Sequence, residues 1–395
     1  MPAGRGVTIR AAVSHGVGVP PSIEDLQLNA PNPNEVRVEI TACAVCHSDL
    51  SSLDGTWATD FPLVLGHEAT GYVVELGESG NEYGGNGSDL AVGDPVVITL
   101  IRSCGICRAC RRGHDVACTG EISLNRRSPL ADTAGNRIIQ GLNVGAFAEQ
   151  VVVHRSQVVK LPDDVDPVAA SLLGCGVLTG DGAVANTAQV AAGDAVVVVG
   201  CGGVGSGALQ AARLAGAAPI LAVDPLPEKR VAALGFGATH VVDPARDDIA
   251  TVITRATGGY LADHLLVTTG APAALDGAID LLAPMGNLVI VGMAGDDGKI
   301  EVAPSWLAAA NKSILGSKMG TTRVAEDIPS LIDHHRAGRL DLQGMVSSVH
   351  SLDNIAEAFD EVWRGEVLRT VVLPNEAEET FQGSKTISKK AASTC

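Results

Sequence analysis

The chain has 395 residues, enough for two domains, and 46% of them are hydrophobic, which excludes a disordered chain. Its formal net charge of -17 argues against nucleic acid or an anionic membrane as a partner, because phosphate binding needs a basic surface. No apolar run is long enough for a signal peptide or a membrane span, so we expect a cytoplasmic protein. We expect no nucleic acid and no membrane as a partner.

The first part of the chain, residues 1–176, is expected to be mainly β-structure. EVRVEI (35–40) alternates apolar and polar residues, which is typical of a half-buried strand. AVGDPVVITL (91–100) and FAEQVVVH (147–154) predict further strands between Gly- and Asp-rich turns. The Gly-, Asn- and Ser-rich stretch at 77–94 predicts a surface loop.

A cluster of four cysteines lies within this first part. Cys104, Cys107, Cys110 and Cys118 follow the spacing C-x2-C-x2-C-x7-C. Four thiolates at short spacing can close a tetrahedron around zinc with no vacant position. Disulfides fit a reducing compartment poorly, whereas an iron–sulfur cluster stays open from the ligands alone. We favour a closed structural zinc site.

A second set of metal-ligating residues is scattered along the chain. Cys46, His67 and Cys175 stand in ACAVCHSDL, LGHEATG and LLGCGVLTG. Each means little alone, since a single histidine or buried cysteine is more often structural. Together, two cysteines and one histidine are a known three-ligand zinc set that leaves a fourth position for water or substrate.

The pattern changes near residue 195 to a buried strand, a glycine turn, a helix and a second buried strand. Continuous apolar strands of this kind belong to parallel sheets covered on both faces. The turn GCGGVG places Gly200, Gly202 and Gly205 in a G-x-G-x-x-G pattern, and Asp224 ends the next strand. This context predicts dinucleotide binding, with NAD favoured over NADP because the Asp224 carboxylate would repel a 2′-phosphate. A glycine-rich turn of another α/β fold is the alternative.

The remaining elements continue the rhythm of a doubly wound sheet. They are a strand in 263–270, a helix in 271–284 and a strand in 286–293. After about residue 320 the chain continues with a helix in 325–338 and a last strand in 368–374. The polar end, 375–395, predicts a mobile tail.

In this order the motifs resemble those of the medium-chain zinc-dependent alcohol dehydrogenases, over nearly the full length apart from the tail. The resemblance is carried by Cys46 with Ser48 and Asp49, GHE at 66–68, the four-cysteine loop 104–118, GCG around Cys175, GxGGVG and Arg369 in RTVVLP. It implies an α/β protein in which a doubly wound parallel Rossmann sheet (177–319) interrupts a mostly-β GroES-like catalytic domain (1–176 and 320–374), with the active site in a cleft.

The resemblance also implies roles for individual residues. Cys46, His67 and Cys175 would hold a catalytic zinc and the four-cysteine loop a structural one, giving two Zn per chain. Ser48 would accept the first proton, Asp49 would orient His67, and Glu68 would be a nearby carboxylate. The cofactor would contact His47, Thr179, Gly200, Gly202, Gly203, Val204, Gly205, Asp224, Lys229 and Arg369. The substrate pocket would be lined by Trp57, Leu100, Leu142 and Trp306, with core packing as the alternative for both tryptophans.

The resemblance therefore implies reversible hydride transfer between a primary or secondary alcohol (or its aldehyde or ketone) and NAD, in a homodimer or homotetramer. The alternatives are a thiol-adduct (S-hydroxymethyl) formaldehyde dehydrogenase and a nicotinoprotein that keeps NAD bound. A non-catalytic zinc protein is disfavoured by the intact cofactor motif. Two departures stand out: Ser51 occupies a position where many relatives have a relay histidine, and Lys318 one where an apolar residue is usual.

Overall fold

The computed structural model describes residues 6–78, 89–295 and 298–375. The expected loop at 77–94 lies mostly outside these residues, and so does the expected tail except for Asn375. The described chain forms two compact units. We call 1–107, 119–174 and 342–395 the barrel unit, and 108–118 with 175–341 the parallel-sheet unit.

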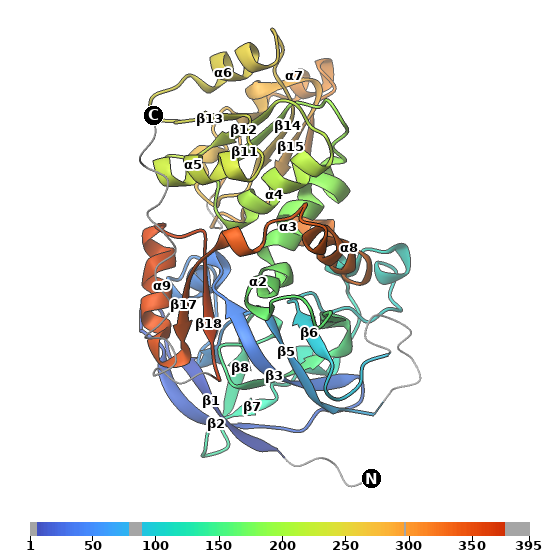
Figure 1. The fold of residues 1–395 in the computed structure, drawn as a ribbon, viewed down its shortest axis with the longest axis vertical. Coiled ribbons are helices and arrows are strands. Elements are labelled where there is room, and N and C mark those ends of the chain that lie inside the picture. Colours follow the sequence, from blue (N-terminus) through green and yellow to red (C-terminus); the bar gives the residue numbers. More distant parts are fainter. Residues whose placement is uncertain (1–5, 79–88, 296–297, 376–395) are drawn as a thin grey trace. The chain divides into compact units, whose positions relative to one another are not determined.

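The barrel unit contains a closed five-stranded barrel and a seven-stranded sheet (Figure 1). The barrel strands, in spatial order, are β1 (Val7–Ser14), β2 (Ser22–Leu28), β7 (Leu130–Ala131), β8 (Arg137–Gln140) and β4 (Leu63–Val64). The sheet runs β10 (Val158–Lys160), β6 (Pro95–Ile98), β5 (Glu68–Leu76), β3 (Glu35–Ala44), β18 (Arg369–Leu373) and β17 (Val346–Ser351), and β9 (Gln150–His154) also pairs with β3. Its α-helices are α1 (His47–Leu53), α2 (Pro167–Ser171) and α9 (Ile355–Arg364).

The strands expected near residues 35, 91, 147 and 368 are confirmed as β3, β6, β9 and β18. In β3 the apolar residues Val36, Val38 and Ile40 are buried while Glu39 is exposed, as the alternating pattern predicts. The strand continues beyond the predicted segment to Ala44, so it ends just before Cys46. The position of Cys46, the first expected metal ligand, is therefore set by the end of a regular strand.

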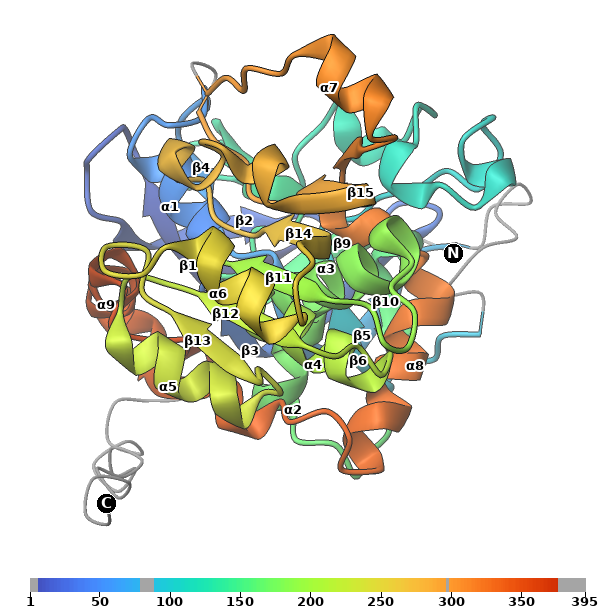
Figure 2. The same cartoon turned by 90° about the horizontal axis from the view of Figure 1, so that it is seen from above.

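The parallel-sheet unit is built on six strands that all run in the same direction. Their order is β13 (His240–Val242), β12 (Ile220–Val223), β11 (Val196–Val199), β14 (Ala262–Val267), β15 (Leu282–Ile290) and β16 (Ser313–Gly316), with β11, β12 and β13 side by side in Figure 2. The α-helices are α3 (Gly176–Gly182), α4 (Gly203–Leu214), α5 (Pro227–Gly235), α6 (Ile249–Ala256), α7 (Pro304–Ala309) and α8 (Val324–Arg336). The expected doubly wound sheet is thus confirmed.

The helix expected at 271–284 is wrong. That segment forms two short 3-10 helices, Pro272–Ala274 and Ala278–Leu281, and β15 already begins at Leu282. Gly277 separates them in a left-handed conformation (φ 65°), which no α-helix contains. The apolar periodicity is real, but the glycine breaks the backbone path.

The contact-based boundaries differ from those expected from sequence. Residues 320–341, which include α8, and residues 108–118 of the cysteine loop belong to the parallel-sheet unit. In the described part of the chain no single helix is long and apolar enough to cross a membrane. One bent pair of helices, Pro167–Gly174 with Gly176–Ala188, has the length and apolar composition of a membrane span only when the two are taken together.

Candidate metal and cofactor sites

The carboxylate of Asp49 organises two of the expected metal ligands. Asp49 is fully buried in α1, and Cys46 is the residue that caps this helix. One carboxylate oxygen accepts hydrogen bonds from the Gly66 peptide N–H (3.0 Å) and His67 Nδ1 (3.1 Å), and the other accepts from the Cys46 peptide N–H (3.0 Å). The predicted pairing of Asp49 with His67 is present, and the same group fixes the backbone beside both ligands.

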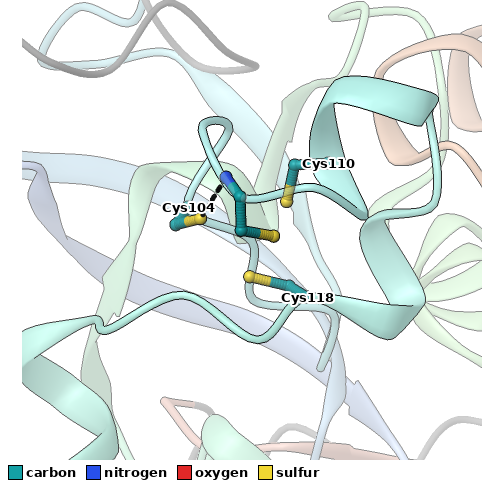
Figure 3. Close-up of side chains that lie close together, drawn as sticks. Cys104, Cys110 and Cys118 are labelled. Atoms are coloured by element: carbon teal, nitrogen blue, oxygen red, sulfur yellow. Dashed lines mark hydrogen bonds between the residues drawn. The ribbon is translucent and has the colours of Figure 1, made fainter.

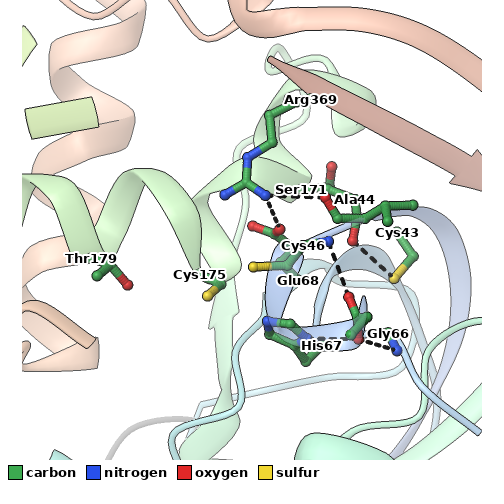
Figure 4. A network of polar contacts seen from close by, with 12 residues as sticks. Cys43, Ala44, Cys46, Gly66, His67, Glu68, Ser171, Cys175, Thr179 and Arg369 are labelled. Carbon is green, nitrogen blue, oxygen red and sulfur yellow. Dashed lines mark hydrogen bonds and ion pairs between the residues drawn. The ribbon is translucent and has the colours of Figure 1, made fainter. Parts of the chain in front are cut away.

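The three expected ligands of the catalytic metal come together. The ligand atoms of Cys46, His67 and Cys175 all lie within 4.8 Å of one another (Figure 4). The three residues are only 6%, 0% and 5% exposed. Cys175 follows Gly174, where a Cβ would lie 2.4 Å from the Ile98 carbonyl oxygen, so only glycine permits this close approach of the chain.

The donor set fits a zinc ion. Two sulfur atoms and one imidazole nitrogen match the three-ligand zinc sites that keep a fourth position open. His67 Nε2 is buried and makes no hydrogen bond to a described residue. Burial alone lowers the pKa of His67, but the charge and hydrogen bond of Asp49 outweigh it and raise the pKa well above its usual value.

Glu68 and Arg369 form a buried ion pair beside these ligands (Figure 4). Arg369 Nη1 donates to Glu68 Oε1 at 2.8 Å and to the Val45 carbonyl oxygen at 3.1 Å. Glu68 is fully buried and Arg369 is 4% exposed. Glu68 is therefore near the ligands as expected, and its partner is the residue expected to contact the pyrophosphate, a role that stays a prediction.

Sequence reasoning missed Met319, which lies against two expected site residues. Its Sδ is 3.7 Å from Cys175 Sγ and 3.5 Å from Thr179 Oγ1. Met319 has a left-handed backbone (φ 49°), as do Gly320 and Thr321, and such conformations of non-glycine residues concentrate at functional sites. Lys318 next to it is exposed. A single methionine in KMGTT carries no motif that could have flagged it.

The four-cysteine loop forms the second donor cluster. The sulfur atoms of Cys104, Cys107, Cys110 and Cys118 lie within 4.8 Å of one another. Figure 3 shows the side chains of Cys104, Cys110 and Cys118 pointing toward one another. The Cys107 peptide N–H donates to Cys104 Sγ at 3.3 Å, so the loop also stabilises a sulfur by its backbone. Four sulfur atoms at such short separations match a closed metal site.

The glycine turn is shaped to receive a phosphate group. Gly200 has φ +92°, and a Cβ at Gly205 would lie 1.9 Å from the Gly200 carbonyl oxygen, so neither position tolerates another residue. A Cβ at Gly202 would meet nothing within 4 Å, which leaves the turn open at that point. Gly203 begins α4, a helix of 12 residues whose first N–H groups suit an anion, and Val204 follows it, partly exposed. These features fit a dinucleotide.

Asp224 directly follows β12, at the position expected from the sequence. It is 5% exposed, and its carboxylate accepts from the peptide N–H groups of Cys201 (2.7 Å) and Leu226 (2.9 Å). The first bond ties Asp224 to the glycine turn itself. Lys229 lies in the first turns of α5, partly exposed.

The residues at the start of α1 differ in accessibility. His47 is exposed and Ser48 is partly exposed. Ser51 is only 7% exposed, and its carbonyl oxygen accepts from the Trp57 peptide N–H at 2.9 Å. The position of the missing relay histidine therefore lies inside the barrel unit, with Trp57 half-buried beyond the helix end.

Leu100 and Leu142, expected in the substrate pocket, pack against the core of the barrel unit. Leu142 has φ 46°, an unusual conformation for a bulky residue. The next residue, Asn143, is also left-handed (φ 66°), and its carbonyl oxygen accepts from Arg102 Nη2 at 2.7 Å. Arg102 is 8% exposed, and sequence reasoning missed it because nothing local marks an arginine as buried.

Trp306 lies elsewhere. It is 65% exposed on α7 and lines a cavity of about 600 Å³ together with Ile279, Leu307 and Lys312. None of the zinc-ligand residues lines this cavity. The exposure rules out core packing for Trp306, and its pocket role stays a prediction.

Comparisons with known proteins match this geometry. Residues 32–163 match the model described as alcohol dehydrogenase GroES-like domain, and residues 203–335 match the one described as zinc-binding dehydrogenase. An NDMA-dependent alcohol dehydrogenase from Amycolatopsis methanolica is 33% identical over 92% of this chain and 98% of its own length.

Two solved structures share the fold over 93% of this chain. An alcohol dehydrogenase zinc-binding domain protein from Burkholderia ambifaria has a TM-score of 0.86, 33% identity and 100% of its chain covered. A benzyl alcohol dehydrogenase from Acinetobacter calcoaceticus has a TM-score of 0.84, 29% identity and 99% of its chain covered.

Proposed function

Because this chain belongs to the medium-chain zinc-dependent alcohol dehydrogenase family, we propose that it is an alcohol dehydrogenase that exchanges hydride between a primary or secondary alcohol and NAD. The observation that carries the proposal is the buried cluster of Cys46, His67 and Cys175, with Asp49 fixing two of the three. When bound, zinc would act as a Lewis acid toward a substrate oxygen, and NAD would supply the hydride acceptor.

The residues of this chain divide the work around that chemistry. Asp49 holds Nδ1 of His67, which leaves Nε2 for the metal. Ser48, partly exposed and two residues after Cys46, is our candidate for the first proton acceptor from the alcohol. Gly202 and the start of α4 would receive the pyrophosphate, and Asp224 the adenosine ribose.

Cys46→Ser should abolish NADH formation with simple alcohols and remove one zinc per chain while the protein stays folded. Cys43→Ser is the matched control, because Cys43 is fully buried and is no part of either donor cluster. Full activity in Cys46→Ser would overturn the proposal.

We also propose two zinc ions per chain, one in each cluster of Figures 3 and 4. Cys107→Ser should remove the other zinc and lower the unfolding temperature while Cys46 and its partners keep theirs. Metal analysis of the wild type that finds one zinc, or iron, per chain would contradict this.

A variant of this function is that NAD stays bound between turnovers and is recycled by a second substrate. NAD that remains with the protein through gel filtration would support it. A screen of primary, aromatic and thiol-adduct alcohols separates ordinary alcohol oxidation from thiol-adduct oxidation.

For assembly we propose a homodimer or homotetramer. Large apolar side chains at Met285, Met293 and Trp306 are 62% to 70% exposed in the parallel-sheet unit, and burial of exposed apolar surface between copies would favour association. Light scattering on the purified protein measures the assembly directly, and a monomer would contradict the proposal.

A further inference from the structure

Two aspartates end neighbouring strands at the same edge of the parallel sheet. β12 and β13 are parallel with Val223 opposite Val242, so Asp224 and Asp243 both follow at the carboxyl end. The Asp224 peptide N–H donates to the Val242 carbonyl oxygen at 3.3 Å. The dinucleotide-binding motif includes Asp224 but not Asp243.

An arginine from α5 joins the two. Arg230 Nη1 donates to the carbonyl oxygen of Asp224 at 2.6 Å, and Nη2 donates to Asp243 Oδ2 at 3.0 Å. The side chains of Arg230 and Asp243 are 15% and 16% exposed. Arg230 therefore lies directly beside the residue proposed to bind the adenosine ribose, without touching its carboxylate.

The Asp243 carboxylate is itself held in place. Asp243 Oδ1 accepts a hydrogen bond from the Ala245 peptide N–H at 3.0 Å. The Asp243 peptide N–H donates to Asp247 Oδ2 at 2.8 Å. Arg246 Nε is 3.9 Å from Asp243 Oδ2, but its side chain is 86% exposed and competes weakly. Arg230 is thus paired with a fixed acceptor.

We infer that Asp243 is a second determinant of the preference for NAD, because it neutralises and retains an arginine that could otherwise bind the 2′-phosphate of NADP. An arginine near the acidic residue of this motif is the group that accommodates that phosphate in NADP-binding proteins. Here Asp224 repels the phosphate, and Asp243 keeps the nearest guanidinium from compensating. This inference rests on the proposed function, since it takes Asp224 as the ribose contact.

The experiment measures dissociation constants of NADH and NADPH by nucleotide fluorescence, without substrate or turnover. Asp243→Asn should lower the ratio of the NADPH to the NADH constant about tenfold, the effect of one charge-assisted hydrogen bond. Asp224→Asn should lower it as well, and the double variant should gain more than the product of the two effects, since the phosphate then meets a free guanidinium and no carboxylate.

Two controls separate the mechanism from a general charge effect. Asp248→Asn makes the same change in net charge at an exposed residue five positions away that has no part in this arrangement, and it should leave the ratio unchanged. Arg230→Gln combined with Asp243→Asn should return the ratio to its wild-type value. A ratio unchanged in Asp243→Asn, or a gain that survives the loss of Arg230, overturns the inference. If the wild type binds neither nucleotide, it is the proposed function that fails.

Discussion

At the residue scale, Asp49 does more than orient one imidazole. Its two oxygens accept from His67 Nδ1 and from the peptides of Cys46 and Gly66, all without exposure to water. An amide at this position has one accepting oxygen and cannot satisfy donors on both sides. The carboxylate is therefore needed for the positions of two ligands at once.

We expect Asp49→Asn to weaken binding of the catalytic zinc about 10- to 100-fold and to lower activity in parallel. Competition with a chelator, followed by metal analysis, measures the affinity. The control is Asp54→Asn at the exposed end of the same helix. Equal zinc affinity in both variants would show that Asp49 serves only to hold the start of α1, through its hydrogen bond with the Cys46 peptide N–H.

Trp57 is the second residue at which a single substitution tests a specific role, here in the choice of substrate. It is half-buried after α1, with its peptide N–H bound to Ser51. Large rigid rings occupy volume that smaller residues leave open. Trp57→Leu should therefore raise kcat/KM for branched or bulky alcohols relative to small ones, whereas Trp363→Leu, at a residue 57% exposed on α9, should not. An unchanged substrate ranking would assign Trp57 to packing.

At the scale of elements, the turn after β8 depends on one buried guanidinium. Arg102 donates to four oxygens from three segments of the chain: Asn125 Oδ1, Gln140 Oε1, the Asn143 carbonyl and Gln157 Oε1. Burial lowers the pKa of Arg102 to about 10, an effect that the charge of Glu35 opposes. These bonds hold Leu142 and Asn143 in left-handed conformations that cost energy locally.

Arg102→Met should lower the free energy of unfolding by about 3 kcal/mol, because buried oxygens lose their donors. It should also let Leu142 relax and change KM for longer alcohols more than for short ones. Urea unfolding and steady-state kinetics measure the two effects. Arg126→Met, at a side chain 73% exposed, is the control, and similar losses in both variants would contradict a specific role.

At the scale of the whole molecule, one partly buried acid affects how the free energy of unfolding depends on pH. Burial, with a smaller contribution from the charge of Asp327, raises the pKa of Asp181 to about 6 from 3.8. Between these values the folded protein holds a proton that the unfolded chain releases. The contribution of Asp181 to the free energy of unfolding is thus favourable below pH 4 and is lost as the pH rises to 6, by about 3 kcal/mol.

Asp181→Asn should therefore raise the free energy of unfolding by up to about 3 kcal/mol at pH 7.5 and by much less at pH 4.5. Denaturant unfolding at the two pH values provides the measurement, with Asp333→Asn as the control because Asp333 is exposed on α8. A gain of the same size at both pH values would place the cause outside ionisation.

The sequence by itself determined the features that depend on short spacings. The four-cysteine loop, the glycine turn followed by Asp224 and the parallel strands were all predictable, because their geometry follows from a few consecutive residues and from strand periodicity. The three expected ligands of the catalytic metal lie far apart in the chain, and the family resemblance, not their spacing, predicted them together.

The tertiary structure alone decided how distant segments meet. It placed Met319 in contact with Cys175, let Arg102 donate a hydrogen bond to the Asn143 carbonyl oxygen and paired Arg230 with Asp243. It also replaced the expected helix at 271–284 by two short turns. None of the three side-chain contacts has a local signature, because a side chain's partner depends on backbone positions that only packing of the complete chain fixes.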